Sequence, residues 1–289
     1  MARRLPPPTL DDAPLAPGLY VVATPIGNLR DITLRALDVL AAADLVLAED
    51  TRVTGKLLSA YGLSARLERY DEHGAERTRP LALRALGEGK RVALVSDAGT
   101  PLVSDPGYRI VRQAAAEGHP VFPIPGASAL LAGLSAAGLP SDRFLFAGFP
   151  PPKSAARRSF LDELAPIRAT LVFFEGGSRL AASLLDMAAV FGPREGAVCR
   201  ELTKLYETIV RGSLPDLAAD PRFEAPRGEL VILVGPGRET EASATDVDTA
   251  LIDALQRLRP ADAAAEVAKA LGLSRREVYQ RAMQIRAGR

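Results

Sequence analysis

Ser96-Asp97-Ala98-Gly99-Thr100-Pro101 is the stretch on which the prediction of the fold depends. It follows the apolar, β-branched run 91–95, which is typical of a buried strand, and it precedes residues 108–116, which have the pattern of a helix. In open α/β sheets, ligands bind at the carboxyl ends of strands. Gly99 lets the backbone approach a ligand, and Asp97 can accept hydrogen bonds from hydroxyl or amino groups. The alternative is that the stretch is only a polar strand-to-helix connection.

The order of strand, small-residue loop and helix occurs four times in the first half of the chain. The expected strands are residues 19–23, 45–48, 91–95 and 120–124. The expected helices around them are residues 33–43, 53–61, 76–86 and 108–116, with a further helix after Ser128. This alternation predicts an α/β fold with a parallel sheet whose loops converge on one edge.

Length and composition predict two α/β domains and a helical tail. We expect a disordered or draped N-terminal arm at 1–17, α/β domains at 18–126 and 127–237, and a helical tail at 245–289. The proline-rich stretch 149–152 has the composition of an interdomain passage or a flap. In the tail, residues 263–286 have the pattern of a helix, a glycine turn and a second helix, with Ser274 as its N-cap.

Composition also excludes several classes of protein. The net charge is +1, so any nucleic-acid binding would need a local basic surface. One cysteine and two histidines exclude intrachain disulfides and the usual zinc clusters, so we expect no metal. The sequence has no apolar signal peptide and no segment long enough to span a bilayer, so we expect a cytoplasmic protein.

Three common catalytic signatures are absent. The first expected strand is not followed by GxGxxG, and Gly89-Lys90 lacks the flanking residues of a phosphate-binding P-loop. Residues 126–130 begin like the nucleophile elbow of a serine hydrolase but lack its final glycine, and the only histidines are His73 and His119. These observations argue against a dinucleotide-binding Rossmann domain, a P-loop enzyme and a serine hydrolase.

Five motifs, in this order along the chain, resemble those of the tetrapyrrole-methylase superfamily of S-adenosylmethionine-dependent methyltransferases. They are Thr24-Pro25-Ile26-Gly27-Asn28, Ser96-Asp97-Ala98-Gly99-Thr100-Pro101, Pro125-Gly126-Ala127-Ser128-Ala129, Arg200-Glu201-Leu202-Thr203-Lys204 and Gly228-Glu229-Leu230-Val231. Residues 48–52 and the region of Lys204 resemble the branch that methylates the ribose 2′-hydroxyl of a cytidine in 16S ribosomal RNA. The similarity covers about residues 19–237, and the helical tail is also similar to that branch.

The chain departs from the pattern of the superfamily in two places. Thr24-Pro25-Ile26-Gly27-Asn28 replaces the more common Gly-x-Gly-x-Gly-Asp, and this variant resembles the RNA-modifying branch. It therefore argues against a porphyrinoid substrate. Glu175-Gly176-Gly177-Ser178-Arg179 lacks the proline and histidine of a Glu-x-Pro-His-Arg pattern, so no role for an imidazole is expected there.

The resemblance implies a cofactor cleft between two α/β domains, usually in a homodimer, with 16S ribosomal RNA in the 30S subunit as substrate. The residues expected to contact S-adenosylmethionine are Pro25, Gly27, Ser96, Asp97, Ala98, Gly99, Pro125, Gly126, Ser128 and Ala129. The alternative is that these loops are only tight turns.

Methyl transfer to a hydroxyl requires alignment of the acceptor oxygen and removal of its proton. The candidate bases are Glu49, Asp50, His73 and Lys204. Asp50 is equally suited to capping the next helix, His73 to a solvated loop, and Lys204 to an ion pair with a neighbouring glutamate.

RNA affinity is expected to come from local positive charge and from aromatic stacking. The candidate RNA contacts are Arg30, Arg52, Lys153, Arg157 and Arg158, and the candidate stacking groups are Tyr20, Tyr70 and Phe149. Two further functions stay open: a porphyrinoid C-methyltransferase, and a ligand-sensing regulator that uses the tail as a DNA-binding helix-turn-helix.

Overall fold

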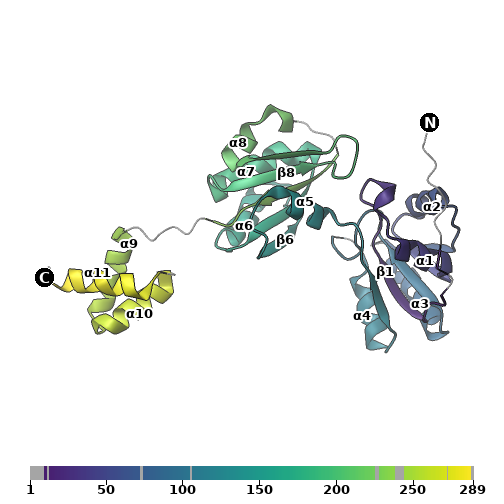
Figure 1. Cartoon of the computed structure of the whole chain (residues 1–289), viewed down its shortest axis with the longest axis horizontal. Helices are drawn as coiled ribbons and strands as arrows, with labels where there is room; N and C mark the ends of the chain where they lie inside the picture. Colours follow the sequence, from purple (N-terminus) through teal and green to yellow (C-terminus); the bar gives the residue numbers. More distant parts are fainter. Residues whose placement is uncertain are drawn as a thin grey trace. The chain divides into compact units, whose positions relative to one another are not determined.

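The structure is a computed structural model that describes residues 10–11, 13–71, 74–104, 106–224, 228–237, 244–271 and 273–287. The chain forms two compact units, Met1–Pro236 and Gly237–Arg289 (Figure 1). The first unit contains two five-stranded sheets, and the second is helical where it is described. A search of the described helices finds none that is long and apolar enough to cross a membrane.

The first sheet is parallel throughout, as the alternating pattern predicted. Its strands are β1 (Gly18–Val22), β2 (Leu45–Ala48), β3 (Leu67–Arg69), β4 (Arg91–Val95) and β5 (Val121–Ile124), in the order β3-β2-β4-β1-β5. All four residues of β2 are buried, and so are the last four of β4. Such continuous apolar runs are typical of parallel strands that are covered on both faces.

Helices cover both faces of this sheet. They are α1 (Leu34–Ala42), α2 (Thr51–Ala60), α3 (Ala75–Gly87) and α4 (Tyr108–Ala116). Val46 and Val95 pack with residues of α1 and α2, whereas Leu47 and Leu94 pack with residues of α3 and α4. Because neighbouring residues of a strand point to opposite faces, the two cores share the same strands. From the region expected to be a disordered or draped arm, Leu15 packs against the core on the side of α1 and α2. Leu10 packs against a separate small cluster of Leu37, Leu57 and Tyr61.

The loops that follow the strands are joined by hydrogen bonds at one edge of the sheet. Thr24 and Gly99 exchange backbone hydrogen bonds of 2.9 and 3.0 Å, which tie the loop after β1 to the loop after β4. The Asp50 N–H, after β2, donates to Asp97 Oδ1 at 2.9 Å. The Thr100 hydroxyl donates to the Ala127 carbonyl, after β5, at 3.2 Å. The convergence that the sequence predicted is confirmed.

The second sheet is mixed. Its strands are β6 (Phe144–Gly148), β7 (Thr170–Gly176), β8 (Glu195–Arg200), β9 (Thr208–Ser213) and β10 (Glu229–Val234), in the order β6-β7-β10-β8-β9. Within this sheet β6 and β7 pair in parallel, whereas the other described pairs, β7–β10, β10–β8 and β8–β9, are antiparallel. The sequence did not indicate β6 as a strand, because its apolar residues continue directly into a run of prolines.

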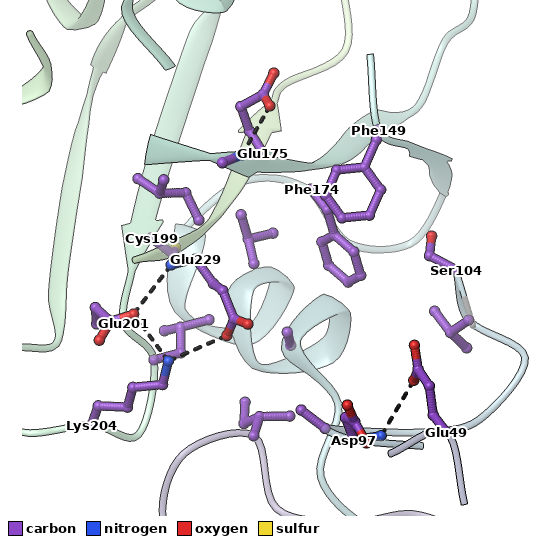
Figure 2. A pocket seen from close by; sticks show the side chains of 18 residues that line it. Glu49, Asp97, Ser104, Phe149, Phe174, Glu175, Cys199, Glu201, Lys204 and Glu229 are labelled. Carbon is purple, nitrogen blue, oxygen red and sulfur yellow. Dashed lines mark hydrogen bonds and ion pairs between the residues drawn. The ribbon is translucent and has the colours of Figure 1, made fainter. Parts of the chain in front are cut away.

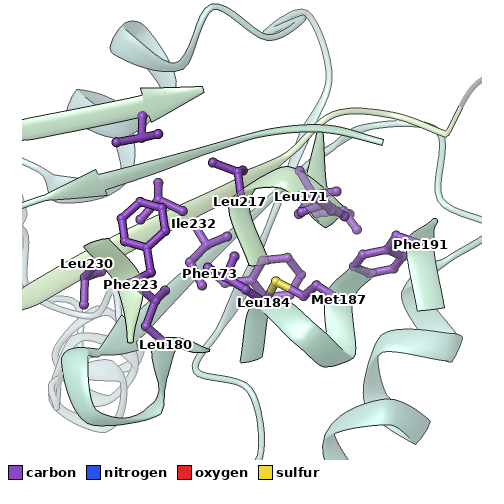
Figure 3. Close-up of a cluster of buried hydrophobic side chains, with 14 of the residues drawn as sticks. Leu171, Phe173, Leu180, Leu184, Met187, Phe191, Leu217, Phe223, Leu230 and Ile232 are labelled. Carbon is purple, nitrogen blue, oxygen red and sulfur yellow. The ribbon is translucent and has the colours of Figure 1, made fainter. Parts of the chain in front are cut away.

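Helices also cover both faces of the second sheet. They are α5 (Ala129–Ala137) on one face, and α6 (Ser154–Leu164), α7 (Leu180–Phe191) and α8 (Leu214–Ala219) on the other. Figure 3 shows the larger of the two cores, in which Phe173 and Ile232 of the sheet meet Leu184 and Met187 of α7. The second unit contains α9 (Ala244–Leu255), α10 (Pro260–Leu271) and α11 (Arg275–Ala287), which confirms the helical tail.

Arg157 of α6 is a structural residue, which corrects its expected role as an RNA contact. Only 3% of the residue is exposed, and its Nε donates to Asp186 Oδ2 at 2.8 Å. Burial alone would raise the pKa of Asp186, but hydrogen bonds from Arg158, Ser154 and Arg157 lower it. The carboxylate therefore stays charged and holds the Arg157 guanidinium in the protein interior.

Removing the Asp186 carboxylate should strongly destabilise the first unit. Asp186→Ala leaves the buried Arg157 guanidinium without its counter-charge, and we expect a loss of about 3–5 kcal/mol in the free energy of unfolding. Urea denaturation followed by circular dichroism measures this loss. The control is Glu76→Ala, which breaks the exposed Glu76–Arg109 pair and should cost less than about 1 kcal/mol. Equal losses in the two variants would contradict the structural role of Asp186.

Candidate functional site

A cavity of about 450 Å³ lies in the first unit and is lined by loops that follow the strands of the first sheet and by strands, loops and α5 of the second (Figure 2). From the first sheet and its loops come Ile26, Glu49, Asp97, Ala98, Val103 and Ser104. From α5, the second sheet and its loops come Ala129, Phe149, Phe174, Glu175, Gly176, Cys199, Glu201, Leu202, Lys204, Glu229, Leu230 and Val231. The volume is in the range of small-molecule and cofactor sites, about 300–1,000 Å³.

Two carboxylates form the acidic side of the cavity. Glu49 follows β2 and Asp97 follows β4, and these strands are neighbours, so the Asp97 N–H donates to Glu49 Oε2 at 3.4 Å. Burial is the main reason why the pKa of Glu49 is raised, and the nearby carboxylate of Asp97 raises it further. Burial also raises the pKa of Asp97. Carboxylates with raised pKa values in a cavity are suited to proton transfer.

A charged cluster around Lys204 lines another part of the cavity. Lys204 Nζ donates to Glu201 Oε1 at 3.0 Å and to Glu229 Oε2 at 3.2 Å, as Figure 2 shows. Burial would lower the pKa of Lys204, but its hydrogen bonds and attraction to the two glutamates raise it overall. The ammonium therefore remains protonated. A Cβ at Gly27 would overlap the aliphatic part of Lys204, so the lysine lies directly over this glycine.

Two loops at the cavity hold side chains in an uncommon backbone conformation. Leu102 and Ser104 have φ values of 74° and 64°, and Glu201 and Thr203 have values of 52° and 66°. In the described part of the chain these are the only residues other than glycine with a positive φ. Such conformations cost free energy and often occur at binding and catalytic sites. Here they place Ser104 and Glu201 at the cavity.

Aromatic rings form an apolar wall. The rings of Phe149 and Phe174 meet edge to face with centroids 5.7 Å apart, and Phe146 supports Phe174 at 4.7 Å. Phe149 is 55% exposed. Cys199 is buried in the same region, and burial raises the pKa of its thiol to about 11. The thiol is therefore protonated near neutral pH and is not suited to act as a nucleophile.

The residues expected to bind a cofactor divide into those at the cavity and those that shape its loops. All ten belong to the described part of the chain, and Asp97, Ala98 and Ala129 line the cavity. Ser96 donates to the Gly99 carbonyl at 3.2 Å, and Ser128 caps α5. The others that do not line it are Pro25, Gly27, Gly99, Pro125 and Gly126.

Among the candidate bases, Glu49 and Lys204 line the cavity. Asp50 instead caps α2 and pairs with Arg52, whose guanidinium holds the pKa of the carboxyl well below its usual range. His73 lies outside the described residues.

Among the expected RNA contacts, the residues exposed at the surface are Arg30, Arg52, Lys153 and Arg158. Arg52 pairs with Asp50, and Arg158 donates to Asp186 at 2.6 Å. Of the candidate stacking groups, Tyr20 and Tyr70 are buried in the cores of the first sheet, so neither can receive a base. Phe149 alone of the three is exposed.

Several cavity residues were not assigned a role from the sequence. Glu201 and Glu229 lie inside recognised motifs, so their position was a signal that could have been used. Ser104 and Phe174 carried no such signal. They reach the cavity because of a left-handed backbone in one case and the end of β7 in the other.

Comparison with known proteins gives two family matches. Residues 18–218 match the family described as Tetrapyrrole (Corrin/Porphyrin) Methylases, and residues 241–286 match the RsmI C-terminal HTH domain. The chain is 49% identical over 275 residues to Ribosomal RNA small subunit methyltransferase I of Mesorhizobium japonicum, with 94% of each chain covered. It is 52% identical over 273 residues to the protein of that name from Erythrobacter litoralis, with 94% of this chain and 97% of the relative covered.

Two solved structures resemble the fold. Cobalt precorrin-4 methyltransferase matches with a TM-score of 0.57 and 22% identity, over 75% of this chain and 94% of that chain. Uroporphyrin-III-C-methyltransferase from Thermus thermophilus matches with a TM-score of 0.53 and 24% identity, over 75% of this chain and 93% of that chain. These likenesses confirm the predicted fold class.

The pKa of Glu49 should depend on the charge of Asp97. Asp97→Asn keeps the backbone hydrogen bond to Glu49 but removes the nearby negative charge, so we expect the pKa of Glu49 to fall towards its ordinary value. Titration of the Glu49 side-chain carboxyl by NMR measures this pKa. Asp44→Asn, a change elsewhere on the first sheet, is the control and should leave it unchanged. An unaltered titration in Asp97→Asn would show that the two carboxyls do not interact.

Proposed function

The chain belongs to the tetrapyrrole methylase family, and we propose that it is a methyltransferase of ribosomal RNA that uses S-adenosylmethionine to methylate the ribose 2′-hydroxyl of a cytidine in 16S ribosomal RNA. The observation that carries the proposal is the similarity, over nearly the whole length, to relatives named for the methylation of small-subunit ribosomal RNA. The five motifs of the sequence and the acidic cavity support the choice of donor and acceptor.

The residues of the cavity fit S-adenosylmethionine. When bound, this cofactor supplies an electrophilic methyl group on a cationic sulfur. Glu49 and Asp97 provide negative charge where a cationic group would lie, and Ala98 and Ala129 leave the backbone of their loops accessible. Ile26 and Leu202 add apolar surface for the uncharged parts of the molecule. We propose that these residues hold the cofactor.

Glu49 is the base that the site supports best. It lines the cavity, and its raised pKa brings proton acceptance closer to neutral pH. Asp50 has a lowered pKa and is committed to Arg52, while Lys204 is held protonated by Glu201 and Glu229. We propose that the Glu49 carboxylate accepts the proton of the 2′-hydroxyl as the oxygen attacks the methyl carbon. Lys204 would then provide positive charge beside the incoming nucleotide.

The larger substrate and the assembly follow from the same proposal. We propose that 16S ribosomal RNA is presented in the 30S subunit. Its phosphates would be contacted by the exposed cations Arg30, Arg52, Lys153 and Arg158. The working form that we propose is a homodimer in the cytoplasm. We also propose domain boundaries at 18–126 and 127–237, since α5 packs on the second sheet.

The activity is tested by incubating the purified protein with methyl-labelled S-adenosylmethionine and 30S subunits from a strain that lacks the corresponding methylation. We expect label in 16S ribosomal RNA, and nuclease mapping should place it on the ribose of one cytidine. Naked 16S ribosomal RNA, a precursor tetrapyrrole and duplex DNA are the comparison substrates. Methylation of the tetrapyrrole with none of RNA would contradict the proposal, as would label on a base.

Replacing Glu49 should remove the proton acceptor. We expect Glu49→Gln to lower kcat by about 10²–10⁴-fold at neutral pH. Because a carboxyl with a raised pKa is still protonated at mildly acidic pH, the wild-type rate should rise with pH as Glu49 loses its proton, and Glu49→Gln should lack this limb. Single-turnover rates across pH measure both effects. The matched control is Asp50→Asn, which keeps a capping side chain and should stay within a few-fold of the wild type.

A further inference from the structure

We propose that Phe149 is the platform on which the base of the methylated nucleotide stacks. This inference rests on the proposed function and adds a residue that recognises the nucleotide. The ring lines the cavity and is 55% exposed, although it is one of the larger apolar side chains of the protein. An exposed aromatic ring at the wall of a polar cavity is suited to receive the flat face of a nucleobase.

Neighbouring rings hold Phe149 from one side. Phe174 contacts it edge to face, with an interplanar angle of 66°, and Phe174 is itself supported by Phe146. In Figure 2 the ring of Phe149 lies beside that of Phe174, on the same side of the cavity as Ser104. The register of β6 against β7 shifts between Phe146 and Gly148, and Gly148 has a φ of 69°. Such a bulge redirects the side chains that follow it, and here it turns Phe149 into the cavity.

Two arginines, the buried Arg157 and the half-buried Arg179, fix the chain immediately after Phe149. Arg179 donates to the Pro150 carbonyl at 3.1 Å, and Arg157 donates to the carbonyls of Pro151 and Pro152 at 3.3 and 3.1 Å. Each guanidinium is held in turn by a buried carboxylate.

These carboxylates are Glu175 and Asp186. Glu175 accepts from Arg179 Nε at 2.6 Å and from the Ser183 hydroxyl at 2.6 Å, and Asp186 accepts from Arg157 Nε at 2.8 Å. Three consecutive prolines add their own stiffness. The ring is therefore held in place before any ligand arrives, which lowers the entropy cost of stacking.

The surroundings favour a base of the RNA over the adenine of the cofactor. Of the residues that we propose hold the cofactor, the two acidic ones, Glu49 and Asp97, belong to the loops of the first sheet. Ala129 and Leu202 belong to α5 and to the loop after β8, whereas Phe149 follows β6, the edge strand at the other end of the second sheet from β9. Lys153 lies three residues after Pro150 and is exposed. The side chain of Arg158 is also exposed, to 55%. A ring followed directly by exposed cations matches a nucleotide whose base stacks and whose phosphates continue along the surface.

The test compares Phe149→Ala with Phe149→Trp and Phe149→Tyr in methyl transfer to 30S subunits. We expect Phe149→Ala to lower kcat/KM for the subunits by roughly 5- to 150-fold, the range for loss of one stacked base. The two aromatic variants should stay near the wild type. Calorimetry should give a Kd for S-adenosylmethionine that is unchanged in all three. Tyr108→Ala, which removes an exposed aromatic ring that does not line the cavity, should leave every value unaltered.

Three results would overturn the inference. Equal kcat/KM values for Phe149→Ala and the wild type would show that the ring does not meet the substrate. A matching loss in the affinity for S-adenosylmethionine would assign the ring to the cofactor. If the folded wild-type protein binds the cofactor but methylates no RNA, the proposed function fails and the inference fails with it. The wild-type assay thus reports on the function, and the ratio of variant to wild type reports on Phe149.

Discussion

The backbone bridge between Thr24 and Gly99 is the contact on which the cavity depends. It joins the loops that follow β1 and β4, which are neighbouring parallel strands at the middle of the first sheet. With these loops joined, Asp97 is placed to accept from the Asp50 N–H, and Glu49 is held beside it. A parallel sheet sends all its strand ends to one edge, but only such cross-links give that edge a defined surface. The acidic side of the cavity is thus held by hydrogen bonds that main-chain N–H groups donate to the two carboxylates.

The cavity separates charges that would otherwise cancel. Glu49 and Asp97 accept hydrogen bonds from main-chain N–H groups, and their pKa values are raised, mainly by burial. Lys204 has two carboxylates and a raised pKa. The result is one region where a proton can be accepted and another where positive charge is stable. The left-handed backbone at Ser104 and Glu201 costs free energy of folding, and both side chains lie at this cavity.

The sequence predicted the parallel sheet well because β2 and β4 are continuous apolar runs followed by small polar loops, and this pattern is local. It also singled out Asp97 and Glu49 because they lie at strand ends, and both line the cavity. It could not predict the fate of Arg157, since the burial of a cation depends on Asp186, which is 29 residues away. Nor did it indicate that β6 is a strand or that Phe174 reaches the cavity, because both depend on how the second sheet pairs.

The arginine contacts to the proline run have a consequence for how this segment can vary. Arg157 and Arg179 donate hydrogen bonds to the main-chain carbonyls at positions 150–152, and these bonds involve no side-chain atom of the prolines. Every amino acid carries such a carbonyl, so these hydrogen bonds depend on the path of the main chain and not on which side chains it carries. Substitutions at the half-buried position 151 and the exposed position 152 therefore keep these hydrogen bonds, whereas replacement of either arginine removes them.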